Sequence, residues 1–121
     1  MKLMRNQNAS HTDYAAFKGL ISKNPKFVPS NIDGICERNG HFLVLEWKRV
    51  GEKISKGQEL LLKALAKTPK FMVVIIYGDT DDGLNFDHYW LMDEKGECFK
   101  KGLTFEDFTK FYQFWYEIVS D

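Results

Sequence analysis

The chain has 121 residues, of which 44% are hydrophobic and 28% charged, and its formal net charge is zero. This apolar content suffices for a packed core, so we expect one domain over residues 1–121, and two cysteines are too few for a disulfide scaffold. No apolar run approaches the ~20 residues that a membrane helix needs, and the first residues lack the apolar segment of a secretory signal. We therefore expect a cytoplasmic protein without a membrane partner.

The charges are distributed unevenly along the neutral chain. Between positions 48 and 70, seven basic residues stand against two acidic ones, for a net of +5. Between positions 79 and 97, one lysine stands against seven acidic residues, for a net of −6. Either the two segments are ordinary solvated faces, or the basic one contacts a polyanion such as DNA. The basic residues that we single out as DNA contacts are Arg49, Lys53, Lys56 and Lys63.

Apolar spacing and turn residues predict the elements of the first half. A helix is expected from Thr12 or Asp13 to about Ile21, before Asn24-Pro25. A strand near 31–37, the turn pair Asn39-Gly40 and a strand over 41–48 form a hairpin.

The second half begins with a helix over about 53–67, which Thr68-Pro69 ends. The apolar, β-branched run 71–77 is typical of a strand that is covered on both faces, and 87–92 is expected to form another strand. Thr104, with Asp107 three residues later, resembles the start of a last helix that reaches about residue 119. The order α-β-β-α-β-β-α predicts an α/β domain with a mixed central β-sheet flanked by helices.

The last helix is rich in aromatic residues, which would wrap most of its surface. One buried stripe accounts for Phe108, Trp115 and Val119 but leaves Phe114 and Ile118 over. Two interpretations remain open: a helix wedged into the core of the monomer, or the interface of a homodimer.

The hairpin turn has a consequence for two carboxylates. If Asn39-Gly40 forms a two-residue turn, Arg38 pairs with His41 and the numbers of paired residues always sum to 79. Asp33 then lies directly opposite Glu46, on the same face of the hairpin. Two opposed carboxylates repel each other, so a bound Mg²⁺ or Mn²⁺ ion would explain the pairing. The alternative is a surface hairpin with ordinary solvated ion pairs.

Two further residues belong with these acids. Lys48 lies two positions after Glu46 and so points to the same face. Its ammonium group could position a water molecule or stabilise charge on a phosphate. Gln58 lies within the apolar stripe of the following helix and needs a polar partner, either a backbone group or the Asp33/Glu46 site.

In this order, Asn31-Ile32-Asp33-Gly34, Leu45-Glu46-Trp47-Lys48 and Ser55-Lys56-Gly57-Gln58 resemble the PD-(D/E)XK nuclease superfamily, particularly its small phage-type and Holliday-junction-resolvase-like members. The resemblance covers about residues 13–77. It implies a restriction-endonuclease-like core and the cytoplasm of a bacterial or phage-infected cell. The position before Asp33 is Ile32 rather than proline.

The resemblance also implies roles for single residues. Asp33 and Glu46 match the acidic metal ligands, the backbone carbonyl of Trp47 a further ligand, Lys48 the catalytic lysine and Gln58 a residue that supports the site. Asp13 is the one candidate for an additional acid on the first helix. The resulting hypothesis is an Mg²⁺- or Mn²⁺-dependent endonuclease that hydrolyses DNA, including structured or branched DNA. The alternative is a catalytically silent interaction or adaptor module of the same fold, for example one encoded by a phage.

Overall fold

The structure, a computed structural model, describes residues 13–121, and the chain forms two compact units, Met1–Asn31 and Ile32–Asp121. The described part of the first unit contains a single 3₁₀ turn, η1 (Ala15–Phe17), at which the Asp13 carboxylate accepts the backbone N–H of Ala15. The expected α-helix is therefore wrong over residues 13–21, and Thr12, the other expected start, lies outside the described residues. Gly19 interrupts it with a φ of 81°, and its N–H donates to the Pro25 carbonyl. One domain over the whole chain stays a prediction.

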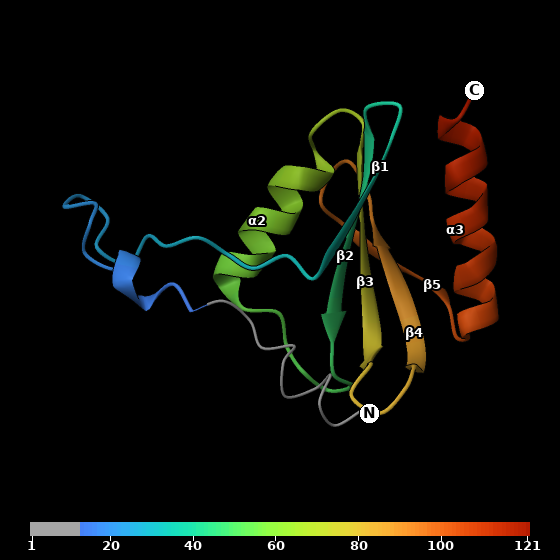
Figure 1. Cartoon of the computed structure of the whole chain (residues 1–121), viewed down its shortest axis with the longest axis horizontal. Coiled ribbons are helices and arrows are strands. Elements are labelled where there is room, and N and C mark those ends of the chain that lie inside the picture. Colours follow the sequence, from blue (N-terminus) through green and yellow to red (C-terminus); the bar gives the residue numbers. More distant parts are fainter. Residues whose placement is uncertain (1–12) are drawn as a thin grey trace. The chain divides into compact units, whose positions relative to one another are not determined.

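The second unit is built on one five-stranded sheet with the order β1-β2-β3-β4-β5. Strands β2 and β3 are parallel, and every other neighbouring pair is antiparallel. Helix α2 (Lys56–Ala66) connects β2 to β3, and α3 (Phe105–Val119) follows β5. The two helices lie on opposite faces of the sheet (Figure 1). The strands are β1 (Gly34–Arg38), β2 (His41–Lys48), β3 (Phe71–Asp79), β4 (Asn85–Met92) and β5 (Cys98–Gly102).

This architecture confirms an α/β fold with a mixed central sheet flanked by helices, but the expected element order needs two corrections. The described residues lack the first α-helix, and the sheet gains β5 at its edge. Four of the five residues of β5 are exposed, so the strand depends on its pairing with β4 rather than on an apolar pattern.

The hairpin between β1 and β2 has the predicted register. Asn39 and Gly40 have φ values of 51° and 79°, as a two-residue turn of type I′ requires. The pairing runs from Arg38 opposite His41 to Gly34 opposite Leu45. Successive side chains of β2 therefore point to opposite faces of the sheet.

Both faces of the central strands are buried. On the α3 face, Leu43 and Ile76 pack with Trp115 of the helix. On the α2 face, Val44 and Ile75 pack with Leu62, Ala66 and other apolar side chains. Glu46 and Lys48 follow Val44 at intervals of two, so they lie on the α2 face of the sheet.

A bulge shapes the end of β4. Tyr77 pairs with His88 but Gly78 pairs with Phe86, so Asp87 is an extra residue on β4. A Cβ atom added to Gly78, whose φ is 154°, would clash with the carbonyl oxygen of Asn85. The bulge turns His88 toward the α2 face, where it stacks on Tyr77, and Phe86 toward α3.

Helix α3 begins as predicted, because the Thr104 side chain accepts the backbone N–H of Asp107 at 3.1 Å. One stripe of this helix, with Phe108 and Trp115, packs into the core. No helix within the described residues has the length and apolar character needed to cross a bilayer.

Candidate functional site

The end of the first hairpin brings Asp33 next to Glu46. The regular pairing ends at Gly34 and Leu45, one pair short of Asp33. Instead of a further strand hydrogen bond, the Oδ2 atom of Asp33 accepts the backbone N–H of Trp47 at 2.8 Å. Asp33 is exposed, whereas Glu46 is 2% exposed, so one carboxylate lies at the surface and the other is buried.

The same contact fixes the direction of the Trp47 carbonyl. In a β-strand, the N–H and C=O of one residue point to the same side of the strand. The N–H of Trp47 points toward Asp33, so its carbonyl oxygen also points to that side, beyond the end of β1. The Asp33 and Glu46 carboxylates and the Trp47 carbonyl therefore all belong to the end of the β1–β2 hairpin.

The environment of Glu46 opposes its ionisation. Burial raises the pKa of the Glu46 carboxyl from its ordinary 4.5 to about 7, and the negative charge of Asp33 adds to the increase. The positive charge of Lys48 lowers the pKa, but not enough to offset these two effects. A buried acid with this pKa is a group whose charged form lacks sufficient compensation within the described chain.

Lys48 and Gln58 complete the cluster. The Lys48 ammonium donates to Oε1 of Gln58 at 2.5 Å and lies 3.6 Å from Oε2 of Glu46. The Gln58 amide nitrogen donates to the same Glu46 oxygen. The Gln58 side chain is thus bonded to both of the buried charged residues. Of the two partners that the sequence left open, the structure selects the acidic site.

The start of α2 positions this glutamine. The Ser55 side chain caps the helix by accepting the backbone N–H of Gln58 at 3.2 Å. Because Gln58 stands in the first turn, its side chain reaches back to β2 beneath the helix. The spacing of Ser55 and Gln58 is that of a capping box, in which the glutamine side chain would bond the backbone N–H of Ser55. Here the Gln58 side chain bonds Lys48 and Glu46 instead.

Sequence reasoning missed Glu52. Its carboxylate lies 3.7 Å from the Lys48 ammonium and is 48% exposed. Glu52 follows a turn, in which the backbone N–H of Arg49 donates to Oε1 of Glu52. Lys48 and Glu52 are four positions apart, a spacing that predicts an ion pair only when both residues lie on one helix. No helix was expected over residues 48–52, so the sequence did not indicate this ion pair.

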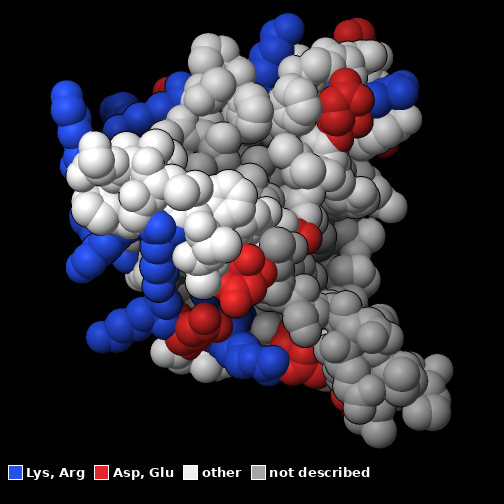
Figure 2. Space-filling model, turned by 60° about the vertical axis from the view of Figure 1, so that its left-hand side comes forward, with Lys and Arg blue, Asp and Glu red and all other residues white. Residues whose placement is uncertain are grey.

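The basic residues singled out as DNA contacts are largely paired with acids. Arg49 contacts Asp81, and Lys56 and Lys63 both contact Glu59. Lys53 is exposed. Figure 2 shows both Lys and Arg side chains and Asp and Glu side chains on the face that it draws. The basic and acidic segments of the sequence meet where Arg49 contacts Asp81.

The donor set fits a magnesium-type ion. Mg²⁺ prefers oxygen ligands and commonly takes one or two carboxylates, with waters and substrate phosphates completing its shell. Asp33 and Glu46 supply two carboxylates, and Trp47 supplies a backbone carbonyl. A cation would relieve the repulsion between the two carboxylates. Over residues 13–121 there is no group of three or more His, Cys, Asp or Glu side chains that could hold a metal ion by themselves. Asp13 belongs to the first unit of the chain.

Comparison of the chain with protein-family models, with curated proteins and with solved structures found no match. Function must therefore be inferred from the geometry of the site.

Proposed function

We propose that this chain is an Mg²⁺- or Mn²⁺-dependent endonuclease that hydrolyses DNA phosphodiester bonds, including those of structured or branched DNA. Its sheet would be the restriction-endonuclease-like core of a PD-(D/E)XK nuclease. The observation that carries the proposal is the convergence of Asp33, Glu46, Lys48 and Gln58 at one corner of the sheet. Two acids, a lysine and a supporting amide are the groups that metal-assisted phosphodiester hydrolysis uses.

Asp33, Glu46 and the carbonyl of Trp47 would hold the cation. When bound, it would polarise the scissile phosphate and lower the pKa of a water molecule. The Lys48 ammonium donates a hydrogen bond to Oε1 of Gln58 at 2.5 Å. This bond fixes the position from which the ammonium would orient that water or stabilise phosphate charge. Gln58 positions Lys48 and Glu46 together, and is a positioning residue because it contacts both of them.

Arg49 and Lys53 would contact the phosphate backbone, since they follow Lys48 closely in the chain. Lys56 and Lys63 on α2 would extend these contacts. The neutral net charge of the chain and the acidic partners of Arg49, Lys56 and Lys63 make this contribution modest, so we expect DNA binding to weaken only moderately as the salt concentration rises.

The test is cleavage of a panel of DNA substrates: plasmid, linear duplex, flap and four-way junction, with Mg²⁺, Mn²⁺ or a chelator. Wild-type protein should cleave at least one substrate only when a divalent cation is present. Asp33→Asn and Lys48→Met should each lower the rate by at least about a hundredfold, since each removes a group that acts on the reacting phosphate. Asp33 is exposed, so this variant is not expected to unfold the protein.

The matched control is Glu106→Gln with Lys110→Met, which removes an exposed acid–lysine pair on α3. This double variant should cleave at the wild-type rate. Full cleavage by Asp33→Asn and Lys48→Met, or no cleavage of any substrate by the folded wild type, would overturn the proposal. The second result would favour a catalytically silent interaction or adaptor module on this fold.

A further inference from the structure

Arg49, the residue after Lys48, is held by the turn between β3 and β4. One guanidinium nitrogen contacts the Asp81 carboxylate, and another lies 3.7 Å from Oδ2 of Asp79. The Arg49 side chain is 63% exposed and that of Asp81 50% exposed, so both can also reach solvent or a ligand. These contacts join two segments of opposite charge that are 32 positions apart in the sequence.

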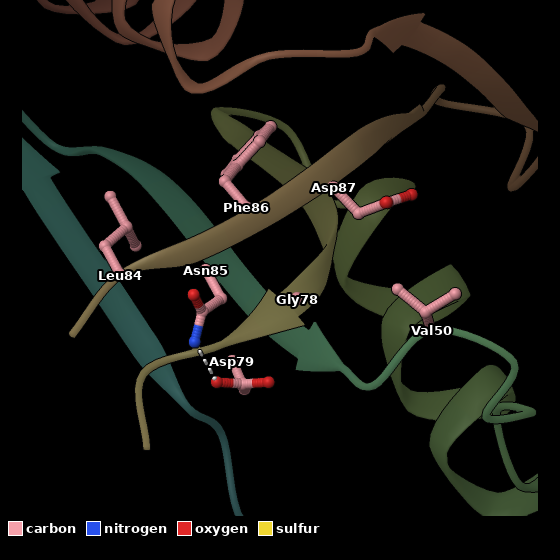
Figure 3. Close-up of a pocket in the computed structure, with 7 residues that line it drawn as sticks. All are labelled: Val50, Gly78, Asp79, Leu84, Asn85, Phe86 and Asp87. Carbon is pink, nitrogen blue, oxygen red and sulfur yellow. Dashed lines mark hydrogen bonds between the residues drawn. The ribbon is translucent and has the colours of Figure 1, made fainter. Parts of the chain in front are cut away.

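The turn itself is shaped to present the two acids. The Oδ1 atom of Asp79 accepts from the Asn85 side chain at 2.9 Å and from the backbone N–H of Asp81 at 3.3 Å. These bonds leave Oδ2 as the Asp79 oxygen that faces Arg49. The hydrogen bond from Asn85 also holds the pKa of Asp79 below its ordinary value, so this carboxylate is charged at neutral pH. Figure 3 shows Asn85 reaching across the strand ends to Asp79.

Further acidic residues lie close to this ion pair. An open depression of about 470 Å³ lies beside the turn, and Val50, the residue after Arg49, forms part of its wall. Asp79 and Asp87 are among the residues that line it (Figure 3). A phosphate would be repelled by these acids, whereas Arg49 offers the planar, permanently charged donor group that binds phosphate well.

We propose that the Asp79–Asp81 turn is an internal competitor for the DNA phosphate at Arg49. In the free protein, the Asp79 and Asp81 carboxylates pair with the Arg49 guanidinium at the place where a DNA phosphate would bind. DNA that uses Arg49 must displace Asp81 from the guanidinium, so the contact lowers the affinity of the protein for DNA. This inference rests on the proposed function, because it assigns DNA phosphate as the competing anion and Arg49 as a determinant of DNA affinity.

The test measures DNA affinity without cleavage, by fluorescence anisotropy of a labelled duplex in a metal-free buffer of low salt. Asp81→Asn should tighten binding by about fivefold, the effect of losing one exposed ion pair that competes with the ligand. Asp82→Asn is the matched control, since it removes the same charge from the same turn but leaves the Asp81 carboxylate that contacts Arg49. It should change the affinity by less than about twofold.

A double variant separates competition from general charge. In the Arg49→Met background, adding Asp81→Asn should leave the affinity unchanged, because no guanidinium remains to be released. The gain from Asp81→Asn should also shrink at high salt. Equal effects of Asp81→Asn and Asp82→Asn, a gain that persists with Arg49→Met, or absence of DNA binding by both wild type and Asp81→Asn would each overturn the inference.

Failure of this inference and failure of the proposed function give different results. If the protein cleaves DNA in a metal-dependent way but Asp81→Asn has no specific effect, the inference about Arg49 is wrong and the proposed function stands. If the affinities change as predicted but no substrate of the panel is cleaved, the inference stands and the proposed nuclease activity is wrong.

Discussion

Glu46 is a carboxylate inside the layer between the sheet and α2, and its charge should affect the pH dependence of stability. Its pKa in the folded protein is about 7, above the ordinary 4.5 expected when the chain unfolds. The folded state therefore binds this proton more tightly than the unfolded state. The resulting stability is fully present below pH 4.5 and is lost as the pH rises through 7.

The corresponding variant is Glu46→Gln, which cannot ionise. In metal-free buffer, the free energy of unfolding of the wild type should fall by about 3 kcal/mol more than that of Glu46→Gln across this pH window. Urea unfolding at several pH values between about 4 and 8, followed by circular dichroism, measures the difference. Parallel pH profiles for the two proteins would show that burial does not disfavour the charged form of Glu46.

Gln58 joins Lys48 to Glu46, and its removal deprives two buried charged groups of a shared hydrogen-bond partner. Gln58→Ala should lower the free energy of unfolding by about 1–3 kcal/mol. Gln113→Ala is the control, because Gln113 is an exposed glutamine on the other helix, α3. It should change stability by less than about 0.5 kcal/mol. Equal effects of the two substitutions in urea unfolding would contradict the bridging role of Gln58.

Among the secondary-structure elements, the β3–β4 pair depends on one glycine. Gly78→Ala would drive a methyl group into the backbone of Asn85, so the bulge at Asp87 would have to rearrange. We expect a loss of about 2 kcal/mol or more. Gly57→Ala on α2 meets nothing within 4 Å and should instead stabilise the protein by about 0.5–1 kcal/mol. Thermal melts of both variants give the comparison, and a neutral Gly78→Ala would contradict the observed bulge.

The elements that the sequence predicted well are those with local determinants. Asn39-Gly40 accommodates two positive φ values, and this alone sets the register that brings Asp33 toward Glu46. Thr104 caps α3 through a hydrogen bond to a residue three positions away. Gln58 could be selected because a polar residue on an apolar stripe requires a partner.

The features that the sequence did not predict depend on distant contacts. Strand β5 has no apolar alternation and exists through its pairing with β4. The contact of Arg49 with Asp81 spans a helix and a strand, so charge counts showed two segments but not that they meet. Helical spacing around residues 14–21 was misleading because Gly19 takes a left-handed conformation there.

At the scale of the whole molecule, α3 carries apolar side chains that its own sheet does not cover. The helix buries Phe108 and Trp115 but leaves several large apolar residues 41–60% exposed. We expect these residues to mediate a homodimer, which would place two sites for paired cuts on a two-fold symmetric substrate. They are Phe105, Tyr112, Phe114, Tyr116 and Ile118.

Sedimentation velocity over a series of protein concentrations tests this expectation. Wild-type protein should shift from monomer to dimer as the concentration rises, and the double variant Phe114→Ser with Ile118→Ser should remain a monomer. Both residues lie on the exposed side of α3, so the variant should keep its fold. A wild type that sediments as a monomer throughout would rule out this interface.

Calorimetric titration of Mn²⁺ into the protein at about pH 8 tests the central claim most directly, because it asks whether Asp33 and Glu46 form a cation site independently of any substrate. At this pH the Glu46 carboxyl, with its pKa of about 7, is mostly ionised. We predict saturable binding by the wild type and by the Glu106→Gln control, and loss of that binding in Asp33→Asn and in Glu46→Gln. Binding that is unchanged by both substitutions, or no binding by the folded wild type, would contradict the account.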